Sequence, residues 1–385
     1  MRKLLKKLEI KKKEYSILAI SILVFCLPIY IFGAKDVETY YWGFFSNQVL
    51  NEYIFNPFKD FIGYYGPGIQ MPIGFFPYFH PLSIIFANDL KLFTFFSIIL
   101  NILIQYNYLK KIFRQFNLKK TYSILPLLVI FSISNYNYVW SSDWIQVFYT
   151  YTFFFPCLYY FIKLNKKNDL NSYLKLSFII GFSLLNSHPG NFINFFIFLF
   201  FLSIFNRFFF HFKNKYFYIF LFFLILIYIE PLYFQITEYS KYIYYEPNLI
   251  KIVQGEFLWK HYIAAIALPM NFSEWTGINR YPFYGFIFYL SFYQAIKMIL
   301  NNQSKKNLYI NYIFFVLIIF SLSGFIKKFT FISTVWQFRD IINIISLILF
   351  FIFLESLKET KTKKIILSLC FFYIILFYIG NFYKY

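Results

Sequence analysis

The sequence predicts an all-α fold, a polytopic membrane protein of about 11 transmembrane helices that forms a single transmembrane domain over residues 1–385. Three observations predict it. Apolar residues make up 59% of the chain and charged residues only 14%, whereas soluble domains carry about 25% charged residues. Apolar segments of about 20 residues, the length that crosses a bilayer, recur along the whole chain. Basic residues gather in every second connection. A soluble core could not bury this much apolar surface.

The expected spans follow from the apolar segments and from their breaks at Pro and Gly. Two of the spans are short and form a hairpin at Ser187-His188-Pro189-Gly190, where Pro and Gly supply a turn. We expect spans near residues 15–34, 83–108, 122–139, 144–162, 173–187, 191–206, 216–234, 282–299, 308–325, 340–357 and 364–381. Two long extracytoplasmic loops are expected, at about 35–82 and 235–281. The first apolar stretch is longer than the apolar region of a signal peptide, so we expect it to be retained as an anchor.

The orientation of the spans follows from the basic residues of short loops, which favour the cytoplasmic side. The N-terminal segment MRKLLKKLEIKKK is strongly basic, and every second connection after it is basic too. The connections expected in the cytoplasm are 110–120, 163–168, 207–215, 297–306 and 358–364. The other connections hold most of the acidic residues. The sequence therefore predicts a cytoplasmic N-terminus and an extracytoplasmic C-terminus.

The net charge of +20 is explained by this topology and by contact with the headgroups of membrane lipids, so no nucleic acid partner is expected. The three cysteines, Cys26, Cys157 and Cys370, lie far apart in apolar segments. They are expected to be small buried apolar residues rather than a disulfide framework or a metal site.

The first candidate site is the acidic pair Asp36 and Glu38, which directly follows the first span. A carboxylate at this depth, before the aromatic run at residues 40–42, could act as a general base or as a metal ligand. The alternative is a solvated loop acid beside a belt of interfacial aromatic residues.

Two His-Pro pairs form the second candidate, because His80 and His188 are expected on the same, extracytoplasmic, face. Imidazole can bind phosphate, transfer protons or ligate a metal. The alternative is that each histidine is a polar residue at the end of a helix terminated by Pro.

Two arginines form the third candidate. Arg339 stands at the expected outer entrance to span 340–357, and Arg280 shortly before span 282–299. The guanidinium group offers a rigid fork that matches two phosphate oxygens. Local ion pairs with Asp340 and Glu274 are the alternative.

Some function classes are disfavoured. The chain has no Walker loop, GxSxG, HExxH or CxxC motif. The expected span interiors hold few charges, with Asp89 and its neighbour Lys91 as the main exception. An ion-coupled transporter or a channel usually carries several ionisable groups deep between its helices.

Four features occur in order along the chain: an acid after the first span, the segment GFFPYFHP, the turn SHPG, and WQFR before a late apolar span. This pattern resembles the GT-C superfamily of membrane glycosyltransferases, particularly the bacterial YfhO-like branch. The resemblance implies a protein of the bacterial inner (cytoplasmic) membrane. It would transfer a sugar from a polyprenyl-phosphate-linked donor to a glycan or glycolipid acceptor of the cell envelope, on the extracytoplasmic face.

The resemblance also implies roles for the candidate residues. Asp36 would deprotonate the acceptor or, with Glu38, hold a divalent cation. Arg339 would bind the lipid phosphate, and His80 and His188 would line the cavity. Two alternatives remain open, a flippase or transporter of a lipid-linked glycan, and a glycan polymerase or ligase.

Overall fold

The computed structural model describes residues 12–23, 26–27, 85–86, 89–115, 145–164, 167–186, 213–234, 285–301, 349–351, 353–354, 357, 361–369 and 372. Secondary structure within these residues is helical, and none of them lies in a strand. The prediction of an all-α fold is thus confirmed for the described part of the chain.

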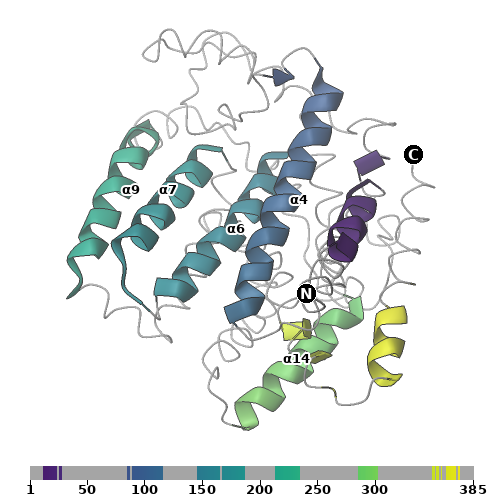
Figure 1. Cartoon of the computed structure of the whole chain (residues 1–385). Coiled ribbons are helices and arrows are strands. Elements are labelled where there is room, and N and C mark those ends of the chain that lie inside the picture. Colours follow the sequence, from purple (N-terminus) through teal and green to yellow (C-terminus); the bar gives the residue numbers. More distant parts are fainter. Residues whose placement is uncertain are drawn as a thin grey trace, which may run out of the picture. The chain divides into compact units, whose positions relative to one another are not determined.

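Long helices dominate this part of the chain (Figure 1). They are α4 (Leu90–Gln115), α6 (Ile145–Leu164), α7 (Leu170–Asn186), α9 (Lys215–Phe234) and α14 (Gly285–Leu300). Shorter helical segments cover 12–23, 349–351 and 361–369. Each coincides largely with an expected span. Among the described residues, no helix combines the length and the apolar character needed to cross a membrane.

The chain divides into two compact units. The first comprises Met1–Leu27, Leu109–Val139 and Pro247–Tyr385, and the second comprises Pro28–Tyr108 and Trp140–Glu246. Helix α4 thus contributes its first part to the second unit and its last turns to the first. That both units belong to a single membrane domain stays a prediction.

Aromatic contacts join neighbouring helices of the second unit. The ring of Tyr108, on α4, lies 5.8 Å from that of Tyr159 and 6.1 Å from that of Tyr160, both on α6. Tyr173, in the first turn of α7, packs against Phe217 and Phe220 of α9, with ring centroids 6.4 and 6.2 Å apart. Helices α4, α6, α7 and α9 therefore follow one another in a row within this unit (Figure 1).

Helix α9 is apolar around most of its circumference. Phe217 and Phe220 are buried on the side facing α7, whereas large apolar side chains on the other sides stay exposed. Those more than half exposed are Tyr218, Phe222, Ile225 and Leu226. The helix thus presents a broad apolar surface away from its neighbour.

The first unit is held by contacts between segments far apart in the sequence. Lys110, near the end of α4, donates a hydrogen bond to the carboxylate of Glu14. Phe113 packs against Phe351 with ring centroids 4.5 Å apart. Phe353 packs against Tyr293 of α14 at 6.5 Å. These contacts bring together four helical segments that lie far apart in the sequence: the N-terminal segment, the end of α4, α14 and the segment around Phe351.

Helix α4 differs from the span predicted at 83–108. It begins at Leu90, because the Asp89 carboxylate accepts a hydrogen bond from the backbone N–H of Leu92 at 3.0 Å and caps the helix. The exposed Asp89 is therefore a cap and not a charge inside a span. The helix also continues through residues 110–115, which were expected in a loop. Lys, Arg and Gln are good helix formers, and Ile112 and Phe113 are fully buried there.

Candidate functional site

All six predicted site residues, Asp36, Glu38, His80, His188, Arg280 and Arg339, lie outside the described residues, as do the two long loops. Their arrangement stays a prediction. The same holds for the divalent cation. In the described ranges no three His, Cys, Asp or Glu side chains gather in a way that could hold a metal ion, but these ranges do not include Asp36 and Glu38.

The structure reveals a different polar feature, which we call the α4 polar row. It consists of Ser97, Asn101 and Gln105, which are spaced four residues apart and therefore share one face of the helix. Their exposed fractions are 0%, 2% and 0%. The Gln105 side-chain amide donates a hydrogen bond to the hydroxyl of Thr152, on α6, at 2.9 Å. The row thus faces the interior of the second unit, and one end of it is fixed to α6.

The hydrogen bonding of this row is incomplete. Ser97 Oγ, Asn101 Nδ2 and Gln105 Oε1 are buried and have no hydrogen-bond partner among the described residues. Leaving a buried donor or acceptor unsatisfied costs about 1–3 kcal/mol. Three such groups along one helix face are an unusual concentration, because most buried polar groups in native proteins have a partner.

Apolar packing holds the row in position. Ile98 and Ile102, next to row members in sequence, are at most 2% exposed. On α6, Pro156 lies one turn after Thr152 and lacks the N–H that would bond to the Thr152 carbonyl. The backbone ladder of α6 is therefore interrupted at the turn that contacts Gln105.

Sequence reasoning missed this row because it searched the span interiors for charges. The signal that could have found it is the spacing of uncharged polar residues, Ser-x₃-Asn-x₃-Gln, within a segment otherwise rich in Phe, Ile and Leu. Such a spacing marks one helix face in the same way as an apolar stripe does.

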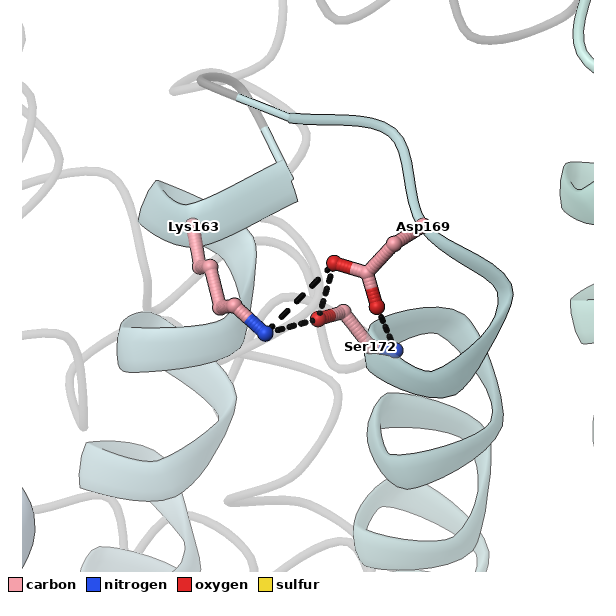
Figure 2. A network of polar contacts seen from close by, with 3 residues as sticks. All are labelled: Lys163, Asp169 and Ser172. Carbon is pink, nitrogen blue, oxygen red and sulfur yellow. Dashed lines mark hydrogen bonds and ion pairs between the residues drawn. The ribbon is translucent and has the colours of Figure 1, made fainter.

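A second polar cluster joins α6 to α7 and consists of Lys163, Asp169 and Ser172 (Figure 2). The Asp169 carboxylate accepts hydrogen bonds from the backbone N–H and the hydroxyl of Ser172, both at 2.8 Å. Lys163 donates to the Ser172 hydroxyl at 2.8 Å and lies 3.5 Å from the carboxylate. Asp169 thereby caps α7, which begins at Leu170 rather than at the predicted residue 173.

The electrostatics of this cluster favour an ionised carboxylate. Burial acts to raise the pKa of Asp169, but the two hydrogen bonds from Ser172 and the ammonium group of Lys163 outweigh it. The pKa therefore lies below its usual 3.8. These partners make the cluster a structural cap.

A third polar contact is the ion pair between Glu14 and Lys110, in the first unit. The side chains are only 4% and 13% exposed, and the Lys110 ammonium also lies 5.8 Å from the centre of the Tyr15 ring. The pair neutralises two buried charges. It joins the N-terminal helical segment to the end of α4.

The cysteine prediction is confirmed where it can be read. Cys26 and Cys157 are free thiols with no exposed surface, and both lie among apolar neighbours in their helices. Cys370 lies outside the described residues.

Comparison with known proteins adds no relative, because no family model, curated protein or solved structure matches the chain. The likeness to GT-C glycosyltransferases therefore stays a hypothesis that depends on the four sequence features described above.

Proposed function

We propose that this chain is a polytopic protein of the bacterial inner membrane with about 11 spans. We further propose that it transfers a sugar from a polyprenyl-phosphate-linked donor to a glycan or glycolipid acceptor on the extracytoplasmic face. One observation carries most of the support. Within each unit, helix ends for which the sequence predicts the cytoplasmic side contact one another.

The second unit gives three such contacts. Tyr108 and Tyr160 lie near the final turns of α4 and α6. Lys163 and Ser172 join the end of α6 to the start of α7. Tyr173 and Phe217 join the first turns of α7 and α9. The basic-loop pattern assigns all of these ends to the cytoplasmic side, so chain direction and contacts agree.

The first unit, taken by itself, gives a consistent result. Glu14 adjoins the basic N-terminal segment, and its partner Lys110 opens the basic stretch at 110–120. Tyr293 and Phe353 belong to the later halves of the spans expected at 282–299 and 340–357, both of which should end in the cytoplasm. These pairings support the predicted orientation of the spans.

The exposed apolar surface of α9 supports contact with membrane lipids. Tyr218, Phe222 and Ile225 are 57–58% exposed and lie on one side of the helix. A contiguous apolar surface of this kind is rare on soluble proteins and is typical of a membrane or partner contact. Lipid chains would cover it in the proposed arrangement.

In the proposed topology all six site residues lie on the extracytoplasmic side of the membrane. Asp36 and Glu38 follow the helical segment that begins near Glu14, and His188 follows α7, which ends at Asn186. His80, Arg280 and Arg339 precede helices that run toward the cytoplasmic side. In each case the residue adjoins the helix end opposite to the one at the predicted cytoplasmic face.

On that face the chemistry of sugar transfer can be divided among the residues. Asp36 would remove the proton of the acceptor hydroxyl or, with Glu38, hold a divalent cation. Arg339 would bind the phosphate of the lipid leaving group through two parallel hydrogen bonds, with Arg280 as further positive charge. His80 and His188 would contact the phosphate or the acceptor.

The substitution Asp36→Asn tests this proposal. Asn keeps the shape but cannot take up a proton, so transfer should fall by about 10²–10⁴-fold while the fold survives. We would measure glycan transfer by the purified variant in lipid nanodiscs, with Arg339→Lys as a companion that should weaken binding of the lipid-linked donor. Wild-type turnover in Asp36→Asn would exclude Asp36 as the base.

A flippase of lipid-linked glycans is the second candidate, and the α4 polar row would serve it only if the buried row became accessible to the glycan during transport. A flippase needs polar groups along a path through the bilayer, and the expected span interiors hold few charged residues. Ser97, Asn101 and Gln105 add three uncharged polar side chains within α4. Movement of a fluorescent lipid-linked glycan across proteoliposomes without added acceptor would favour this function. A polymerase or ligase, the third candidate, would instead extend the glycan when two lipid-linked substrates are present.

A further inference from the structure

The α4 polar row has a complementary set of unsatisfied groups. Asn101 Nδ2 is a hydrogen-bond donor, Gln105 Oε1 is an acceptor, and Ser97 Oγ is both. In the structure the Gln105 amide nitrogen donates to Thr152, which leaves its Oε1 as the open acceptor. A ligand that satisfies the row must therefore both donate and accept. The three unsatisfied groups carry no formal charge, so they favour a neutral ligand over a metal ion or an anion.

The spacing of the row selects the size of that ligand. Residues four apart on a helix are separated by about 6 Å along the axis. Two successive hydrogen bonds of about 2.8–3.0 Å each span almost the same distance. A single oxygen atom between two row members can therefore accept from one side chain and donate to the next.

We propose that the α4 polar row is a binding site for ordered water. One water molecule would accept from Asn101 and donate to Gln105, and a second would link Asn101 to Ser97. Buried water typically makes about three hydrogen bonds to groups that would otherwise be unsatisfied. The exposed fractions of 0–2% favour a ligand of this size over a sugar. The proposal is independent of sugar transfer.

Solid-state NMR of the full-length protein in liposomes tests the site directly. Asn side chains are labelled with ¹⁵N, and the Asn101 signal is identified by its loss in Asn101→Leu or, if that variant does not fold, in Asn101→Ser. We expect magnetisation transfer from water to the Asn101 side-chain amide. An Asn101 amide signal that receives no transfer from water, while exposed Asn107 does, would overturn the proposal.

Thermal stability provides an independent test. A row that binds water and a row without water predict different changes in the Tm of Asn101→Leu. If water completes the row, Asn101→Leu removes hydrogen bonds and should lower Tm by about 2 °C or more. If the row is dry, the same change removes an unsatisfied amide and Tm should stay or rise. Ile102→Leu is the matched control for a change of shape on the same helix. A Tm of Asn101→Leu at or above that of Ile102→Leu would contradict the water site.

Discussion

The two polar clusters of the second unit differ in how completely they are bonded. At the α6–α7 connection, the Asp169 carboxylate has partners on both oxygens, and Lys163 and Ser172 contact it from two helices. In the α4 polar row, three buried atoms lack a partner within the described parts of the chain. In the first cluster the Lys163 and Asp169 side chains are 38% and 26% exposed, whereas the whole second cluster is buried.

This difference indicates different roles. A cluster that completes its own hydrogen bonds at a helix end needs no ligand, and its capping function accounts for its residues. Incomplete polar groups in an apolar interior lower stability unless something completes them, and within a bilayer that cost is larger. The α4 polar row is therefore a described feature for which packing gives no explanation, and it holds three of the four buried atoms without a partner among the described residues.

Stability can be followed unit by unit through the buried thiols. Cys26 belongs to the first unit and Cys157 to the second. A thiol-reactive dye applied to single-cysteine variants, in a background with Cys370→Ser, reports the unfolding of each unit separately.

The largest loss of stability is expected at the Glu14–Lys110 pair. The pair is buried, as the α4 polar row is, but its two members bond to each other, as Asp169 bonds to Ser172. Glu14→Ala leaves the Lys110 ammonium, 13% exposed, without this carboxylate. Removing one partner of a buried ion pair costs about 3–5 kcal/mol, which the Cys26 reporter should detect. Lys13→Ala, an exposed position on the same helix, should have little effect.

A double-mutant cycle checks the cause of that loss. Glu14→Gln combined with Lys110→Met should cost much less than the sum of the single changes, because no buried charge remains. Additive losses would mean that the two side chains act independently and that bonding within the pair does not set the stability.

A smaller effect is expected for Gln105→Leu, which breaks the link between α4 and α6. Loss of its hydrogen bond to Thr152, together with that to a bound water, should cost about 1–3 kcal/mol. Thr152→Val removes the other partner of the same bond at nearly constant shape. If Gln105→Leu is as stable as the wild type when unfolding is followed at Cys157, the α4 polar row does not contribute to the stability of the second unit.

The cap should have a somewhat smaller effect. Asp169→Ala removes the oxygens that accept from Ser172 and should cost about 0.5–2 kcal/mol. Asn168→Ala, its exposed neighbour, is the control and should be neutral. If both changes cost the same, the cap contributes nothing beyond the loop itself.

The smallest effect concerns pH. Because the folded-state pKa of Asp169 lies below 3.8, its stabilisation is fully present above that value and is lost as pH falls through the folded pKa. The stability difference between the wild type and Asp169→Asn should therefore be constant between pH 5 and 8 and shrink in acid, below about pH 4. A difference that instead changes around pH 6–7 would mean that another group controls it.

The sequence was a good guide to where helices occur and a poor one to where they start. The expected span 144–162 corresponds closely to α6, Ile145–Leu164, since apolar composition dominates there. Asp89 and Asp169 begin α4 and α7 through hydrogen bonds that hydropathy does not measure. Helix pairing, as in Tyr173 with Phe217, depends on side-chain packing that no single segment encodes.

The candidate site was less predictable. The α4 polar row was visible as a spacing, but its burial and the Thr152 contact required the fold. Asp36, Glu38, His80, His188, Arg280 and Arg339 come from sequence features alone. Their shared role depends on the topology, which is therefore the central claim.

Cysteine labelling on either side of α7 tests that claim most directly. In a background with Cys370→Ser, the buried Cys26 and Cys157 should stay unreactive. Asn168→Cys lies in the α6–α7 connection, and Ser187→Cys follows the end of α7. An impermeant maleimide applied to intact cells should label position 187, and should label position 168 only after the membrane is permeabilised. Labelling of position 168 in intact cells would contradict the proposed topology and, with it, the extracytoplasmic placement of the site residues.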